Sequence, residues 1–329
     1  MSSPLSIQEI RSLPKIDLHR HLDCSMRWST LLEIATTLKL DIPQDPAALR
    51  SHFLITEPML DLGSVLKKFL TAQKVLASEE ILERLAFEVC EDAFNDGVHI
   101  LELRYAPTFI TDGHPNLTFE KIHQAFLRGI DRAKKLMPIK VGLICILQRV
   151  LSYDKVAAVT DFAIENRKTF IGLDLADNED GFEPKKFAAL FEKAKSYGLE
   201  ITIHSGESPS PHAGQWMKDS IEILGATRIG HGVQAIHFPD VIELLKKKNI
   251  VLEVCPYSNY LTQAFKTYEE HPLKKLINMG VPVTLNSDDP GMFNSVLSDD
   301  YYIAQKYQYL TKKDFDLCYQ TALKNTFIK

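Results

Sequence analysis

Histidine and acidic residues occur in this sequence at spacings that suit metal binding. His19 and His21 lie two residues apart and alternate with Leu18 and Arg20, so a strand would place both imidazoles on one face, where they could reach one ion. A pair of hydrogen-bonded core histidines is the alternative. His204 is followed, after a glycine, by Glu207, and His231 stands between two glycines. This mixture of ligand types suits zinc, and iron, cobalt or manganese would also accept it.

Two adjacent acids, Asp288 and Asp289, complete this set. The β-branched run before them predicts a buried strand, which Pro290 would end. Two neighbouring carboxylates are costly to bury unless a cation faces them. The alternative is a solvated turn in which one Asp caps the next helix.

These residue types predict metal-assisted hydrolysis. His19, His21, His204 and one Asp could hold an ion that lowers the pKa of a bound water. Glu207 could give a proton to the substrate without being a ligand. His231 could orient the water and stabilise developing negative charge, or it could be a buried, hydrogen-bonded imidazole. The second Asp would remain free to bind substrate.

Short apolar strands and helices alternate along the chain and must position these residues. Strands are predicted at residues 15–23, 98–105, 139–147, 170–175, 199–204, 227–231, 249–254 and 281–286. A short first helix is predicted from the capping box Ser6-x-x-Glu9 to Pro14. Further helices are predicted at residues 29–38, 78–97, 118–136, 152–166, 184–196, 213–224, 239–248 and 271–279, with two more from about 298 and 311. Eight such units predict an α/β fold, the (β/α)8 TIM barrel. An open doubly wound sheet is the alternative, but no Gly-x-Gly-x-x-Gly turn follows the first strand.

The carboxyl ends of barrel strands form the reactive face, so four of the 11 histidines would meet there. The other seven are expected on the surface or in helices. Residues 41–76, expected to be irregular to residue 58 and helical afterwards, form an insertion that could close over a pocket. A packed surface helix pair is the alternative. We expect residues 1–329 to form a single domain, with extra helices in this insertion and at the C-terminus.

Composition excludes several classes of protein. The 329 residues carry a net charge of -5, so the sequence lacks the excess of basic residues that is typical of nucleic-acid-binding proteins. No run approaches the ~18 apolar residues that a membrane span needs. The N-terminus has no signal-peptide features, and the five cysteines show no Cys-x-x-Cys pairing, so we expect a cytoplasmic protein with reduced thiols. Nothing in the sequence indicates an oligomeric state.

Seven motifs resemble the adenosine deaminase family of metal-dependent hydrolases. They follow the family's order over about residues 14–310: PKIDLHRHLD (14–23), LELRYAP (101–107), GLDLA (172–176), HSGE (204–207), RIGHG (228–232), EVCPYSN (253–259) and LNSDDP (285–290). The resemblance implies one Zn²⁺ per chain, held by His19, His21, His204 and Asp288. It also implies deamination of a small-molecule purine nucleoside, with adenosine or 2′-deoxyadenosine becoming inosine or 2′-deoxyinosine plus ammonia.

The resemblance also implies individual roles at the site. Glu207 would donate a proton to purine N1, and His231 would orient the zinc-bound water or act as its base. Asp289 would pair with purine N7, and Asp23 with the ribose 5′-hydroxyl. Asp177 stands where the family usually has a glycine whose N–H contacts purine N3.

The sequence departs from the family pattern at three positions, and the first two of these bear on the substrate. Cys24 stands where the first motif usually continues with glycine, Asp177 replaces the glycine at N3, and Ser205 replaces alanine. Adenine, or a 5′-modified nucleoside such as aminodeoxyfutalosine, is therefore an alternative substrate. Asp23 favours a ribose, and Gly230 argues against adenine because the adenine-specific relatives tend to carry Asp there.

Two further classes of protein are alternatives. A two-metal amidohydrolase needs a bridging group, commonly a modified lysine, but the fourth strand ends in Asp174 and Asp177 without one. A nucleoside-binding relative without activity is the second class. No residue expected at the site is missing from the sequence, which favours an enzyme.

Overall fold

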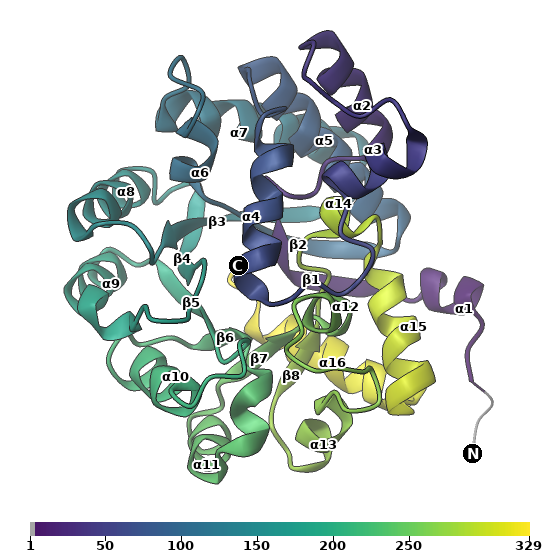
Figure 1. Ribbon diagram of the computed structural model, residues 1–329. Coiled ribbons are helices and arrows are strands. Elements are labelled where there is room, and N and C mark those ends of the chain that lie inside the picture. Colours follow the sequence, from purple (N-terminus) through teal and green to yellow (C-terminus); the bar gives the residue numbers. More distant parts are fainter. Residues whose placement is uncertain (1–3) are drawn as a thin grey trace.

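The computed structural model describes residues 4–329 and contains eight parallel strands, paired in sequence order around a barrel (Figure 1). The strands are β1 (Lys15–His21), β2 (Val98–Tyr105), β3 (Lys140–Gln148), β4 (Phe170–Ala176), β5 (Glu200–Ser205), β6 (Arg228–His231), β7 (Val251–Val254) and β8 (Val283–Leu285). Backbone hydrogen bonds between β1 and the segment after β8 link the two ends of the sheet: His21 N donates to Asp288 O (2.8 Å), and Asp288 N to His19 O (2.9 Å). The predicted (β/α)8 barrel is confirmed.

Helices surround the sheet and fill the connections. They are α1 (Ile7–Ser12), α2 (Trp28–Thr37), α3 (Pro46–Phe53), α4 (Leu62–Gln73), α5 (Glu79–Asn95), α6 (Pro107–Thr111), α7 (Phe119–Leu136), α8 (Tyr153–Glu165), η1 (Pro184–Phe187), α9 (Ala188–Ser196), α10 (Ala213–Glu222), η2 (Val233–His237), α11 (Pro239–Lys248), α12 (Pro256–Leu261), α13 (Leu273–Asn278), α14 (Pro290–Phe293), α15 (Leu297–Gln308) and α16 (Lys312–Asn325). Because helices cover the outer face of the sheet, β6, β7 and β8 are buried at every residue.

Four short helices depart from the sequence prediction. Residues 41–58 were expected to be irregular, which is wrong for α3, and α6, α12 and α14 were not predicted. Each of the four begins with proline at its first position. Proline lacks the N–H that the first turn of a helix leaves unused, so it can start a helix as well as break one. In α3 the Asp45 side chain also accepts a hydrogen bond from Ala48 N (2.8 Å).

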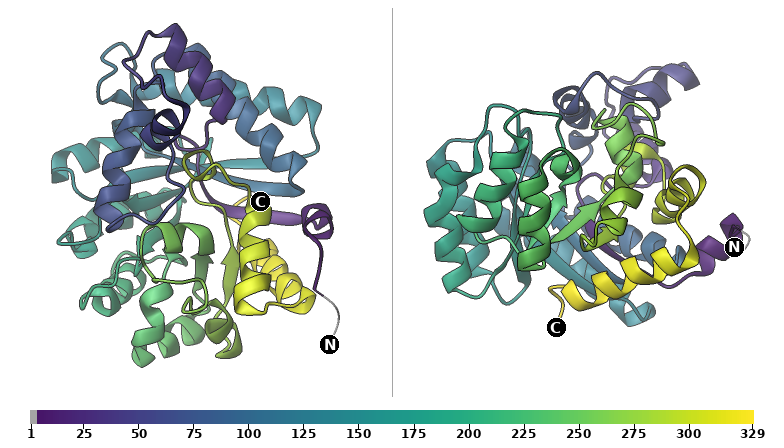
Figure 2. Two further views of the ribbon diagram at one scale, coloured as in Figure 1. Left: turned by 45° about the vertical axis from the view of Figure 1, so that its right-hand side comes forward. Right: turned by 90° about the horizontal axis from the view of Figure 1, so that it is seen from below.

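The two ends of the barrel are covered differently. Helix α4 lies across the mouth at the carboxyl ends of the strands, whereas α16 packs at the opposite end (Figures 1 and 2). At the C-terminal end of α16, Asn325 O accepts from Arg228 Nη1 (2.9 Å), and the next residue, Thr326, donates from Oγ1 to Glu102 Oε1 (2.6 Å). Only the mouth beneath α4 is therefore lined by the predicted reactive residues. Within residues 4–329, no helix combines the length and the apolarity that crossing a membrane requires.

Candidate active site

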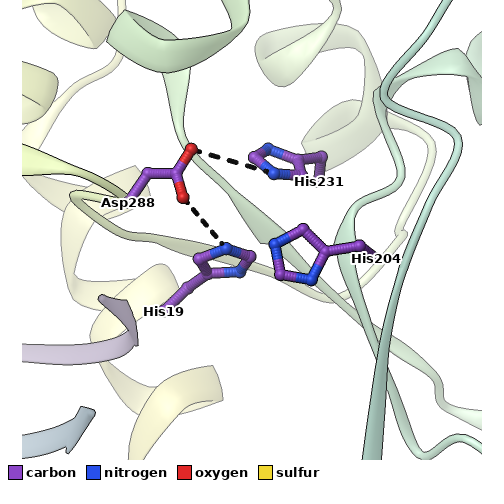
Figure 3. Close-up of side chains that lie close together, drawn as sticks. All are labelled: His19, His204, His231 and Asp288. Atoms are coloured by element: carbon purple, nitrogen blue, oxygen red, sulfur yellow. Dashed lines mark ion pairs between the residues drawn. The ribbon is translucent and has the colours of Figure 1, made fainter. Parts of the chain in front are cut away.

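Five metal-ligand candidates from four strand ends meet at the mouth of the barrel. His19 and His21 come from β1, His204 from β5, His231 from β6, and Asp288 follows β8. Ligand atoms of His19, His204, His231 and Asp288 lie within 4.8 Å of one another, and Figure 3 shows their side chains pointing inward. A second group that could hold a metal ion consists of His21, Asp288 and Asp289, so Asp288 belongs to both groups.

The two oxygens of Asp288 face different partners, which separates four candidate ligands from the fifth. Oδ1 lies 3.2 Å from His19 Nε2 and 3.3 Å from His21 Nε2, and His21 Nε2 lies 3.2 Å from His204 Nε2. Oδ2 instead faces His231 Nε2 at 3.8 Å (Figure 3). His19 Nε2 is fully buried and has no hydrogen-bond partner among the described residues. Three imidazole nitrogens and one carboxylate oxygen, packed together without a bridging proton donor, fit a metal ion.

Carboxylates behind the ring of ligands fix the orientation of two imidazoles. His19 Nδ1 lies 2.8 Å from Glu253 Oε2, and His204 Nδ1 lies 2.8 Å from Asp174 Oδ2. Each carboxylate accepts the Nδ1 proton, which leaves Nε2 bare and turned toward the site. Asp174 is therefore committed to His204 and does not bridge two ions, as a two-metal centre would need.

A buried arginine joins these two carboxylates. Arg104 is fully buried and contacts Asp174 Oδ2 through Nη1 (2.7 Å) and Glu253 Oε2 through Nη2 (2.8 Å). Burial opposes ionisation of Glu253, but Arg104 and Arg228 outweigh it and hold the pKa of this carboxyl well below its usual range. Sequence reasoning did not assign roles to Arg104 and Glu253. The available signal was a charged residue inside each of two strands expected to be buried.

Glu207 is placed to act as an acid. Its carboxyl is buried, and burial, together with the negative charge of Asp288, raises its pKa well above the usual range. Thr262 Oγ1 donates to Oε1 (2.9 Å), while Oε2 lies 3.6 Å from His231 Nε2. A carboxyl kept neutral in this way can donate a proton at neutral pH. Burial lowers the pKa of His231 well below its ordinary value, although the negative charge of Asp288 opposes this, so the imidazole is neutral.

Two further acids offer unpaired oxygens to a ligand. Burial first, and then the charge of Asp288, raises the pKa of Asp289 well above the ordinary value, so Asp289 can be a hydrogen-bond donor. Its Oδ1 and that of Asp23 are buried without a hydrogen-bond partner in the described part of the chain. The second Asp23 oxygen, Oδ2, accepts from Ala106 N (3.0 Å). An orphaned buried oxygen is costly, so both atoms suit a polar ligand group.

A cavity leads outward from these groups. It has a volume of about 650 Å³, and its lining includes His21, Asp23, Cys24 and Asp177, with Phe69 and other residues of α4 as one wall. A smaller hollow of about 50 Å³ shares His21, Phe69 and Asp177 with it and reaches Glu207, His231, Asp288 and Asp289. The cavity has the size of a small-molecule site.

Asp177 occupies a backbone conformation that favours glycine. Its φ is +81°, in the left-handed region, which Asp tolerates better than most residues. Its Oδ2 accepts from Gln148 Nε2 (2.8 Å), and the Asn178 N–H donates to its Oδ1 (2.6 Å). Asp177 thus combines a backbone conformation that glycine favours with a carboxylate in the cavity wall.

Comparisons with known proteins give one consistent result. The family model described as adenosine deaminase matches residues 14–329. An adenosine deaminase from Clostridium botulinum is 34% identical over 323 residues, which cover 96% of this chain and 94% of that protein.

Two solved structures share the fold. The N6-methyl-AMP deaminase from Arabidopsis thaliana has a TM-score of 0.83 at 29% identity, covering 98% of this chain and 95% of that one. The adenine deaminase from Arthrobacter aurescens has a TM-score of 0.88 at 24% identity, covering 96% and 94% of the two chains.

Proposed function

Because the chain belongs to the adenosine deaminase family, and is therefore a hydrolytic deaminase, we propose that it holds one Zn²⁺ and deaminates adenosine and 2′-deoxyadenosine. The products would be inosine and 2′-deoxyinosine, with ammonia released. The observation that carries the proposal is the convergence of His19, His21, His204 and Asp288 beside the neutral acid Glu207.

The four converging side chains would hold the ion. Bound there, zinc would lower the pKa of a coordinated water and so supply hydroxide near neutral pH. Glu253 and Asp174 accept hydrogen bonds from the Nδ1–H groups of His19 and His204, which holds each ring proton on Nδ1 and leaves both Nε2 atoms available to the ion.

The remaining residues would bind and activate the purine. The Glu207 carboxyl donates its proton to N1, which draws electrons away from C6 as the oxygen of water adds there. As the C6–N bond breaks, the new hydroxyl at C6 becomes a carbonyl and its proton passes to the amino group, which leaves as ammonia. The other proton of the water restores the Glu207 carboxyl. Asp289 donates a hydrogen bond to N7 from its neutral carboxyl, and the Asp177 N–H contacts N3. Asp23 Oδ1 accepts from the ribose 5′-hydroxyl.

The charge of the cavity favours a nucleoside over a nucleotide. Four acidic residues line it, and Lys67 is the one Lys or Arg among its lining residues (acidic residues: Asp23, Asp61, Asp177 and Asp180). A 5′-phosphate dianion would meet net repulsion there. The N6-methyl-AMP deaminase acts on a nucleotide, so this chain would differ from it in that respect.

The cavity also supports a second candidate, a nucleoside with a larger uncharged 5′ substituent. It continues past Asp23 to an apolar wall that includes Leu66, Leu70 and Phe109. This wall gives an apolar 5′ group a place to lie, whereas free adenine would leave Asp23 Oδ1 unpaired.

An ultraviolet assay of the purified protein tests the proposal. Adenosine should be converted to inosine, chelation should abolish the reaction, and zinc should restore it. Glu207→Gln should keep its metal and lose about 10²-fold or more of kcat, because it removes a proton donor and no ligand. Glu200→Gln, at the other end of β5, is the matched control and should retain full activity.

The failure of this assay would also be informative. Near-normal kcat in Glu207→Gln would contradict the role of this residue. The protein should also be assayed with adenine, AMP and 5′-substituted nucleosides. If adenosine is turned over more slowly than most of these compounds, the proposed substrate is wrong.

A further inference from the structure

A chain of hydrogen bonds runs from the backbone to His231, behind the face that this imidazole presents to the site. Leu273 N lies 3.2 Å from His271 Nδ1, His271 Nε2 lies 3.1 Å from Asn259 Oδ1, and Asn259 Nδ2 lies 3.1 Å from His231 Nδ1. All three side chains are buried: His271 is 2% exposed, Asn259 0% and His231 1%. Water therefore does not replace any link.

The direction of the chain is fixed at its backbone end. The Leu273 N–H can only donate, so His271 Nδ1 must accept and must carry no proton. A neutral His271 then has its proton on Nε2 and donates to Asn259 Oδ1. This turns the Asn259 amide so that Nδ2 donates to His231 Nδ1. Burial lowers the pKa of His271 to about 3, which keeps the imidazole neutral.

The last link decides which ring nitrogen of His231 carries the proton. Because Nδ1 accepts from Asn259, the proton of the neutral ring must lie on Nε2. Nε2 is the atom that faces Glu207 Oε2 (3.6 Å) and Asp288 Oδ2 (3.8 Å). A protonated Nε2 can donate a hydrogen bond, but it can neither bind a metal ion nor accept a proton.

We infer that Asn259 and His271 are positioning residues that hold His231 in its Nε2–H tautomer. His231 then meets the oxygen that adds to purine C6 as a hydrogen-bond donor, and it is neither a ligand nor the base in the resting enzyme. This role in the reaction rests on the proposed function, whereas the tautomer itself does not. The inference also chooses between the two overlapping groups of ligands, because it leaves His21 rather than His231 to complete the set.

The same short helix orients the proton donor. Asn259 lies in α12, and Thr262, which caps that helix at its end, donates to Glu207 Oε1. This bond leaves Oε2 as the oxygen that carries the proton of the neutral carboxyl. Helix α12 therefore sets proton positions on both His231 and Glu207, and its place on the β7 side of the site is determined by the fold.

The tautomer can be measured directly. Two-bond ¹H–¹⁵N spectra of zinc-loaded protein with ¹⁵N-labelled histidine distinguish the Nδ1–H, Nε2–H and metal-bound forms of each ring. The signals of His231 and His271 are identified by their loss in His231→Gln and His271→Gln. We expect both rings to be neutral with the proton on Nε2. An Nδ1–H, imidazolium or metal-bound pattern at His231 would overturn the inference.

Kinetics test the consequence. Asn259→Leu keeps the side-chain shape and removes the donor, so kcat should fall about 10²-fold while KM and bound zinc change little. His271→Leu should lower kcat in the same way, and His271→Gln, which keeps an N–H donor, should restore most of it. Unchanged kcat in Asn259→Leu would refute the positioning role.

A buried histidine elsewhere provides the matched control. His123 is also fully buried, but its ring nitrogens contact Tyr105 Oη (3.0 Å) and Thr169 Oγ1 (2.7 Å) and not the site. His123→Leu should leave kcat of the folded protein unchanged; an equal fall would show that any buried histidine has this effect and would overturn the role of His271. If the wild-type protein deaminates no purine, the proposed function fails, and the spectra still decide the tautomer.

Discussion

Replacing Arg104 by leucine tests whether the buried charges behind the ligands act as one unit. The change removes the cation that contacts both Asp174 and Glu253, and both carboxylates remain fully buried. Removing one partner of a buried ion pair costs about 3–5 kcal/mol. In the variant, Asp174 keeps its contact with His204, and Glu253 keeps its contact with Arg228. We therefore expect the free energy of unfolding to fall by about 3 kcal/mol, the lower end of this range.

The assay is urea unfolding of metal-free protein at neutral pH, with a surface arginine as the control. Arg128 also pairs with two carboxylates, Glu79 (3.2 Å) and Glu83 (2.8 Å), but its side chain is 46% exposed. Arg128→Leu should cost at most about 1 kcal/mol, because solvent already screens these pairs. The loss of stability in Arg104→Leu should become smaller as the pH falls. Unpaired buried carboxylates have raised pKa values, so they take up protons in the folded state and the cost of burying their charge is removed.

Metal affinity gives a second readout of the same change. Asp174 and Glu253 orient His204 and His19, so loosening them should weaken zinc binding by about 10–100-fold. Arg128→Leu should leave the affinity unchanged. Equal stability losses in the two variants, or an unaltered affinity in Arg104→Leu, would refute the reasoning.

Two further predictions concern a buried histidine and the cavity wall. Burial lowers the pKa of His123 from 6.5 to about 4, so the unfolded chain takes up a proton first as the pH falls. Wild-type stability should therefore drop relative to His123→Gln by about 3 kcal/mol between pH 6.5 and 4; a constant difference in urea unfolding would contradict this. Asp177→Gly removes a carboxylate from the cavity and frees the Gln148 amide. It should raise kcat/KM for AMP relative to adenosine by about tenfold, equivalent to ~1.4 kcal/mol, and an unchanged ratio would argue against charge exclusion.

The fold could be predicted from the sequence because its signals are local. Alternating short apolar runs and helices predicted the barrel, and eight predicted strands are present. The missed α-helices, α3, α6, α12 and α14, all begin with proline, which in a sequence is usually interpreted as the end of a helix. Whether such a proline ends or starts a helix depends on the packing around the next turn, which has no local signature.

The sequence also singled out the residues that the structure brings together at the mouth, although their roles stay predictions. His19, His21, His204 and Asp288 lie at strand ends, and parallel strands of a barrel bring all such ends to one rim. The residue types and the strand period were therefore enough to group them. The sequence also set His231 apart from the ligands, as the residue that orients the water, and this assignment stays a prediction.

Only the tertiary structure could decide the partners behind that rim. Arg104 and Glu253 are 149 residues apart, and His271 was expected on the surface or in a helix, yet it is buried against Asn259. Neither pairing leaves a periodic pattern, because each depends on two distant segments meeting at hydrogen-bond distance. The sequence by itself determined which groups reach the rim, since strand direction and residue type suffice for that. Which protons those groups carry was decided by contacts that exist only once the barrel has closed.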